Sequence, residues 1–287
     1  TGPSGARRAG KDRVGAALMR AAAPAENAAL MPGQPVLRAQ GLHKNFGGVR
    51  AVADISIEVP GGSIFAIIGP NGAGKSTLLN LISGVYQADS GLLSFKGLDL
   101  SGMPAHRRVR LGIARTFQKI RLFKQLSVLD NVIAGFHVHH QIPAWQYVIH
   151  SAAFAEDQRR CHDEAVRLLE FVGMSARMHA VAGALSYGEQ RMLELARALA
   201  TKPNLLLIDE PAAGLNAAEV DGLLDRIRVL RSGGMTVILV EHNMDLVMNV
   251  ADRIMVMDYG RLLFQGAPAE VQKNPAVVAA YLGGELL

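Results

Sequence analysis

The sequence predicts an α/β fold in which helices cover a parallel sheet. After residue 186, helical periods alternate with strand-sized apolar runs, and this alternation is typical of parallel strands joined by helices. Earlier in the chain, a glycine-rich loop stands between an apolar run and a helix-compatible segment. With 287 residues, of which 49% are hydrophobic and 19% charged, the chain is long enough to bury such a core.

The first expected elements are short β-runs separated by glycine turns, at residues 36–39, 55–59, 63–68 and 92–95. Residues 1–35 are rich in Ala, Gly, Pro and Arg without a sustained period, so we interpret them as a disordered tail left by processing or by cloning. Met31 is then a candidate natural start. A transit peptide is the alternative because arginines are frequent there, but no long apolar stretch follows and Asp12 and Glu26 interrupt the segment.

The middle of the chain, residues 126–173, is expected to be helical. Ser127 can cap a helix, and residues 165–171 are apolar at helical spacing. We therefore expect an inserted helical subdomain at about residues 119–184, within a folded domain that covers 36–287. The remaining expected elements are helices at 187–200, 217–231 and 244–250 and strands at 205–208, 236–240 and 253–257.

Residues 69–76 match the phosphate-binding pattern G-x-x-x-x-G-K-[ST], in the strand-loop-helix context that this pattern requires. Glycines let backbone N–H groups turn toward phosphate oxygens, and the following helix adds the positive end of its dipole. Lys75 can then reach the β- and γ-phosphates, the Ser76 hydroxyl suits Mg²⁺, and Thr77 can add a hydrogen bond. The expected nucleotide contacts are Gly69, Asn71, Gly72, Gly74, Lys75, Ser76 and Thr77. A glycine-rich turn with an incidental lysine is the alternative.

Two acids, Asp209 and Glu210, end the apolar run at 205–208. Charge is costly at the end of a buried strand unless a metal or a reaction requires it, and ligands of open α/β sheets bind at this edge. We predict that Asp209 holds Mg²⁺ through water and that Glu210 polarises the water that attacks the γ-phosphate. A solvated strand end is the alternative.

Between the loop and the acids lies the segment LSYGEQR, residues 185–191. With it, the chain from residue 36 to 287 resembles the nucleotide-binding subunits of ABC transporters. The resemblance implies a P-loop NTPase (RecA-like) core with an N-terminal antiparallel β subdomain and an inserted α-helical subdomain. It also implies a head-to-tail dimer, in which Ser186 and Gly188 of one subunit contact the γ-phosphate held by the other. A helix start capped by Ser186 is the simpler use of the same residues.

Three further positions match motifs of this family. Phe46 in NFG matches the aromatic residue that stacks on adenine, Gln118 in TFQ matches the Q-loop glutamine, and His242 matches the switch histidine. The resemblance therefore implies Lys75, Gln118, Glu210 and His242 as catalytic residues, and Ser76, Gln118 and Asp209 as metal ligands. The simpler alternatives are a core aromatic, a solvated loop glutamine and a surface histidine.

Two departures from the family pattern stand out. The signature segment carries Tyr187 and Glu189 where Gly and Gln are commonest, and Asn216 stands where many relatives have Asp. Neither Tyr187 nor Glu189 supplies the contacts expected of Ser186 and Gly188. A neutral amide can still hydrogen-bond across a dimer, so we expect Asn216 to alter coupling rather than activity.

Flanking segments narrow the resemblance to the LivG-type ATP-binding subunits of branched-chain amino acid importers. These segments are FGGVRAV at 46–52, RTFQ at 115–118, RLF at 121–123, DEPAAGLN at 209–216, and NP and YLG near the end. ATP and Mg²⁺ are implied as cofactors, and the implied partners are permease subunits, a sister ATPase or second copy and, indirectly, a solute-binding protein. The implied location is the cytoplasmic face of the inner membrane, as a peripheral subunit. Uptake of urea or amides and lipopolysaccharide export are the alternatives.

The segment Arg121-Leu122-Phe123 offers an apolar anchor for a permease, with intramolecular core as the alternative. The histidine-rich stretch at 137–150 lacks metal-ligand spacing, so we expect a variable surface segment there, and amphipathic contact with a membrane or permease stays open.

Composition excludes other classes of protein. The single cysteine, Cys161, cannot form an internal disulfide, and no apolar run reaches the roughly 20 residues of a membrane helix. No nucleic-acid partner is expected, because the net charge is only +5 and no basic-aromatic groove pattern is present. The alternative of a soluble ABC ATPase acting on nucleic acid lacks the second cassette, zinc modules or coiled coils usual there. A catalytically dead subunit is disfavoured by the intact Lys75, Asp209, Glu210 and His242.

Overall fold

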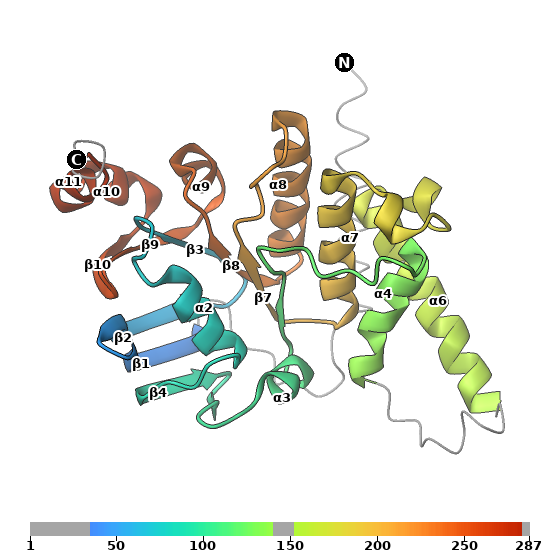
Figure 1. Ribbon diagram of the computed structural model, residues 1–287, viewed down its shortest axis with the longest axis horizontal. Coiled ribbons are helices and arrows are strands. Elements are labelled where there is room, and N and C mark those ends of the chain that lie inside the picture. Colours follow the sequence, from blue (N-terminus) through green and yellow to red (C-terminus); the bar gives the residue numbers. More distant parts are fainter. Residues whose placement is uncertain (1–34, 140–151, 283–287) are drawn as a thin grey trace.

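The computed structural model describes residues 35–139 and 152–282, which form two sheets and the helices around them (Figure 1). The smaller sheet has the order β2-β1-β4-β5 and is antiparallel. Its strands are β1 (Pro35–Phe46), β2 (Val49–Pro60), β4 (Ser90–Phe95) and β5 (Leu98–Asp99). Buried and exposed residues alternate along parts of β1 and β2, as expected for strands with one covered face.

The larger sheet has the order β10-β9-β3-β8-β7-β6, and every pair in it is parallel except β9 with β10. Its strands are β3 (Ile64–Ile68), β6 (Ile113–Arg115), β7 (Leu205–Asp209), β8 (Thr236–Val240), β9 (Arg253–Asp258) and β10 (Arg261–Gly266). All residues of β3, β7 and β8 are buried, because helices and the smaller sheet cover both faces. These strands therefore read as continuous apolar runs in the sequence.

The larger sheet separates two apolar cores. Ile64, Ala66 and Ile68 of β3 belong to one core, whereas Phe65 and Ile67 belong to the other, because successive side chains of a strand point to opposite faces. The first core includes residues of α4 (Val128–Phe136), α6 (Ala152–Val172), α7 (Tyr187–Ala200), α8 (Ala217–Ser232) and α9 (Met244–Val250). The second lies between the sheets and includes α2 (Lys75–Ser83).

Helices α4, α6 and α7 pack against one another at one end of the molecule (Figure 1). The predicted cap of α4 is confirmed, since the Ser127 hydroxyl accepts a hydrogen bond from Asp130 N at 3.0 Å. Residues 140–151 of the predicted helical stretch and residues 1–34 of the predicted tail lie outside the described residues, as does most of the histidine-rich segment. The predicted bounds of the helical subdomain, residues 119–184, stay a prediction. Helix α7 packs on α4 and α6 but follows these bounds in the sequence.

The predicted elements after residue 186 agree with the structure to within one residue, and three of them match it at both ends. The first two β-runs were predicted too short. Both strands run for 12 residues, because irregular register shifts carry their pairing through polar and charged residues that break the apolar pattern.

The remaining elements carry too little periodicity to be predicted. They are α3 (Ala105–Arg110), α10 (Pro268–Lys273), α11 (Pro275–Leu282), β5, β6 and β10. Within the described residues, each helix is too short or too polar to cross a bilayer.

Candidate functional site

The glycine-rich loop between β3 and α2 packs closely against two other strands. Gly69 has φ +151° and Gly74 has φ +97°, which L side chains rarely adopt. A Cβ at Gly69 would lie 2.1 Å from the carbonyl oxygen of Met257, and one at Gly74 would lie 2.1 Å from that of Ala51. Only glycine therefore lets the backbone of this loop reach its position.

The Lys75 ammonium lies inside the loop. Its Nζ donates hydrogen bonds to the carbonyl oxygens of Gly69, at 2.7 Å, and Pro70, at 2.9 Å. Burial lowers the pKa of Lys75, and the nearby charges of Glu210 and Asp209 oppose this shift. A phosphate group entering the loop would compete with these carbonyls for the same donors. Ser76, Asn71 and Gly72 are exposed beside it.

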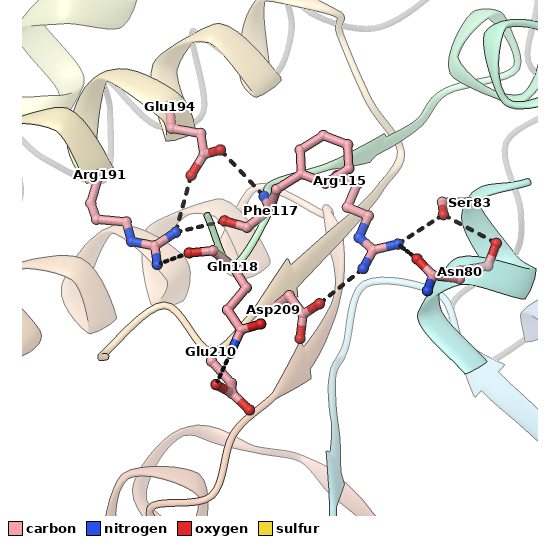
Figure 2. A network of polar contacts seen from close by, with 9 residues as sticks. All are labelled: Asn80, Ser83, Arg115, Phe117, Gln118, Arg191, Glu194, Asp209 and Glu210. Atoms are coloured by element: carbon pink, nitrogen blue, oxygen red, sulfur yellow. Dashed lines mark hydrogen bonds and ion pairs between the residues drawn. The ribbon is translucent and has the colours of Figure 1, made fainter. Parts of the chain in front are cut away.

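Glu210 follows β7 in a left-handed conformation, with φ 46°. This conformation is uncommon for a residue with a side chain, and it marks sites where the surrounding structure holds the backbone. The backbone is held here by a hydrogen bond of 2.9 Å from Glu210 N to the carbonyl oxygen of Val240 on β8. Gln118, 92 residues earlier in the sequence, donates from Nε2 to Oε2 of Glu210 at 2.8 Å (Figure 2). The structure thus brings together two of the predicted catalytic side chains.

Asp209 ends β7 and is buried beside Arg115. Its Oδ2 accepts a hydrogen bond of 2.9 Å from Nη2 of Arg115, and its Oδ1 is buried without a hydrogen-bond partner. Burial raises the pKa of Asp209, whereas Arg115 lowers it. A carboxylate oxygen with free acceptor capacity, next to a helix that carries the Ser76 hydroxyl, is the kind of donor set that Mg²⁺ prefers. These residues fit the predicted metal.

Ser186 and Glu189 form a capping box at the start of α7, so the predicted cap is confirmed. Ser186 N donates to Oε2 of Glu189 at 2.8 Å, and Glu189 N donates to the Ser186 hydroxyl at 3.3 Å. The hydrogen bonds from Ser186 and Arg177 lower the pKa of Glu189. Glu189, which departs from the family pattern, therefore orders the segment that presents the exposed Ser186.

Gly188 and Gly214 bring the signature segment against the start of α8. A Cβ at Gly188 would lie 2.2 Å from Oε1 of Glu219, and one at Gly214 would lie 3.0 Å from the ring of Tyr187. Glu219 in turn forms a capping box with Asn216. Tyr187 and Asn216, which both depart from the family pattern, thus lie where the signature segment contacts the start of α8.

Two buried charged residues of α7, which were not predicted as site residues, hold the backbone around Gln118 (Figure 2). Arg191 donates to the carbonyl oxygens of Phe117, at 2.7 Å, and Gln118, at 2.6 Å. Glu194 accepts from Phe117 N at 3.3 Å and pairs with Arg191 at 3.2 Å. The available signal was their position on the apolar face of a helix, where unpaired charge would be costly.

Phe46 and His242 lie at the margins of this arrangement. Phe46 is 42% exposed at the end of β1, which excludes a core aromatic, and its ring lies 5.1 Å from that of Tyr86. His242 is exposed after β8, beside the fully buried Glu241. Glu241 accepts from Ala212 N at 2.9 Å and His242 N at 3.2 Å, and burial raises its pKa. Among the described residues, no hydrogen bond joins Phe46 or His242 to the predicted site.

A groove of about 540 Å³ opens beside the Gln118 segment. Its lining includes Arg115, Phe117, Arg121, Phe123, Glu194 and Arg197. Phe123 is 54% exposed there, whereas Leu122 is partly buried against the core. Of the predicted apolar anchor, Phe123 is therefore available to a partner, and Leu122 packs within the chain.

A family model described as ABC transporter matches residues 52–213, more than half of the chain. The chain belongs to the ABC transporter family. A second model, described as branched-chain amino acid ATP-binding cassette transporter, matches residues 261–286. The predicted resemblance and fold class are thereby confirmed.

The chain aligns with relatives from this ABC family over nearly the whole length of those proteins. The chain is 40% identical to the high-affinity branched-chain amino acid transport ATP-binding protein BraF of Pseudomonas aeruginosa, over 87% of this chain and 98% of that protein. It is 38% identical to LivG of Escherichia coli over the same shares. A solved ATP-binding cassette of an ABC transporter in its ADP conformation has a TM-score of 0.76 and 31% identity, covering 87% of this chain and 99% of the other.

Proposed function

We propose that this chain is the ATP-hydrolysing subunit of an ABC importer for branched-chain amino acids. The observation that carries the proposal is the meeting of the phosphate loop, Asp209 and the Gln118–Glu210 hydrogen bond at one edge of the parallel sheet. The substrate class is supported by the named relatives at 38% and 40% identity and by the matched C-terminal segment.

We assign the hydrolytic roles as follows. Lys75 leaves the loop carbonyls and donates to the β- and γ-phosphate oxygens, where its charge offsets that of the nucleotide. Glu210 accepts a hydrogen bond from the attacking water and orients it, while Gln118 fixes this carboxylate through Oε2. His242, after β8, contacts the γ-phosphate, and Phe46 stacks on adenine through its exposed ring.

Backbone N–H groups of the loop bind the phosphates, and the contributing positions are Gly69, Asn71, Gly72, Gly74 and Thr77. Asp209, Ser76 and Gln118 would hold Mg²⁺, with Asp209 offering its free Oδ1. When bound, the ion neutralises charge on the phosphate oxygens during hydrolysis.

The partner of this site is a second ATPase subunit, either a sister chain or a second copy. Ser186 is exposed at the N-terminal end of α7, where a helix offers N–H groups and a positive dipole to an anion. Ser186 and Gly188 would thus contact the γ-phosphate held by the other subunit. Hydrolysis at Glu210 would then release the pair.

The groove beside Gln118 is the proposed contact with a transmembrane permease. It combines the exposed ring of Phe123 with the guanidinium of Arg197, which lies 5.6 Å from that ring. Because the groove adjoins the segment that carries Gln118, movement at the nucleotide can reach the permease through it. The chain would then sit peripherally on the cytoplasmic face of the membrane, with a solute-binding protein reached only indirectly.

A trapped complex tests this assignment. Glu210→Gln protein with ATP is captured from detergent-solubilised membranes, and copurifying membrane proteins are identified by mass spectrometry, with the same capture without ATP as the control. Permeases of a branched-chain amino acid importer are expected, together with loss of labelled leucine uptake in a strain that lacks this chain. Permeases for urea, amides or lipopolysaccharide would overturn the substrate class. Recovery of ribosomal or DNA-bound partners alone would overturn the transport function.

A further inference from the structure

Arg115 is the charged residue of the site that neither the motifs nor the roles above explain. It ends β6, where its register partner on β7 is Leu207. Asp209 lies two residues beyond Leu207 and therefore on the same face of the sheet. The Arg115 side chain is thus directed along this face toward Asp209 (Figure 2).

The guanidinium of Arg115 is fixed by three side chains. Nη1 donates to Oδ1 of Asn80 at 2.6 Å and to the Ser83 hydroxyl at 3.1 Å, and Nη2 donates to Oδ2 of Asp209 at 2.9 Å. The Arg115 and Asp209 side chains are only 8% and 5% exposed. A buried pair with this geometry is screened little by water, so it holds both groups in place.

Two of the side chains that bind Arg115 lie on the helix whose first residues belong to the nucleotide site. Asn80 and Ser83 belong to α2, whose first two residues are Lys75 and Ser76. Arg115 therefore ties Asp209 on β7 to the same rigid helix that carries Ser76. Since Oδ2 of Asp209 is taken by Arg115, Oδ1 is the oxygen that keeps free acceptor capacity.

We propose that Arg115 is a positioning residue for the metal-binding carboxylate: it holds Asp209 through Oδ2 so that Oδ1 faces the metal position at a fixed distance from Ser76. This inference rests on the proposed nucleotide site. Arg115 itself touches neither nucleotide nor metal and acts through Asp209. Partners that orient a metal ligand in this way commonly change metal affinity by about 10- to 100-fold when they are removed.

The test measures binding of a fluorescent non-hydrolysable ATP analogue in the presence and absence of Mg²⁺. Arg115→Met keeps an unbranched aliphatic stem but removes the guanidinium and its hydrogen bonds, and it is expected to weaken binding with Mg²⁺ at least about tenfold. Binding without Mg²⁺ should stay within about twofold, because the loop and Lys75 are unchanged. Arg231→Met is the control for loss of an Arg–Asp pair away from the site, since it breaks the more exposed pair with Asp252 on a different part of the chain.

A second variant covers the case in which Arg115→Met fails to fold. Asn80→Ala with Ser83→Ala removes the anchors on α2 and leaves the Arg115–Asp209 pair, so a smaller, Mg²⁺-specific loss is expected. Equal losses of analogue affinity with and without Mg²⁺, or no loss in either condition, would show that Arg115 does not position the metal ligand. Mg²⁺-independent binding of the analogue by the wild-type chain would overturn the metal role of Asp209 and, with it, this inference. If the wild-type chain does not bind the analogue at all, the proposed nucleotide site itself fails, which is a distinct outcome.

Discussion

The phosphate loop is held against two other strands, whereas the first turn of the signature helix is capped by its own residues. Gly69 packs against the carbonyl of Met257 on β9, and Gly74 packs against that of Ala51 on β2. Ser186 and Glu189, three residues apart, satisfy each other in a capping box. The contacts of the phosphate loop thus come from this chain. The signature segment leaves Ser186 exposed at a helix N-terminus, where a phosphate held by another subunit can bind.

The largest expected effect is on ATP hydrolysis, and it comes from changing Glu210 beside the phosphate loop. Glu210→Gln keeps the shape of the side chain but removes its ability to orient water as a carboxylate. We expect ATP turnover to fall by about 10²- to 10⁴-fold with nucleotide affinity retained. Phosphate release and equilibrium nucleotide binding measure the two effects separately. Normal hydrolysis by this variant would remove Glu210 from the role assigned to it.

The next effect tests how closely the loop is packed. Gly69→Ala would place a Cβ 2.1 Å from the Met257 carbonyl oxygen, and we expect a loss of about 3 kcal/mol in the free energy of unfolding. Gly72→Ala is the matched variant, because Gly72 also has a positive φ, +82°, but open space around it. It should lose only about 1 kcal/mol. Urea unfolding of both variants makes the comparison, and equal losses would show that close packing does not matter at Gly69.

A smaller effect separates the two uses of Ser186. Ser186→Ala removes a helix cap and should lower the free energy of unfolding by about 1 kcal/mol. Ser127→Ala is the control, because Ser127 caps α4 in the same way. Both variants should lose similar stability, but only Ser186→Ala should lose ATP hydrolysis while keeping nucleotide binding. If both variants hydrolyse ATP equally well, Ser186 is a cap and nothing more.

The smallest effect concerns pH. Hydrogen bonds from Ser186 and Arg177 lower the pKa of Glu189 below the ordinary value of a glutamate side chain. The ionised carboxylate therefore contributes stability that is present above this value and is lost as the pH falls through the lowered pKa. The difference in Tm between wild type and Glu189→Gln should be largest near neutral pH and should shrink below about pH 4.5. A difference that stays constant over this range would contradict the capping role of the charge.

The sequence alone determined the features that depend on neighbouring residues. The phosphate loop, the buried strands and the caps at Ser127 and Ser186 were all predicted, because each is defined by a short pattern and local backbone geometry. The same holds for the acids at the end of β7, whose position follows from the strand itself. Motifs of this kind also identified the family.

Which distant groups meet depends on the tertiary packing of the chain. Arg115 and Asp209 are 94 residues apart, and the backbone bonds from Arg191 to Phe117 and Gln118 span more than 70 residues. These contacts depend on the strand order β8-β7-β6 and on the packing of α2 and α7 around it, which no local pattern specifies. The sequence therefore supplied the reacting groups, and the packing of the sheet decided which side chains hold them.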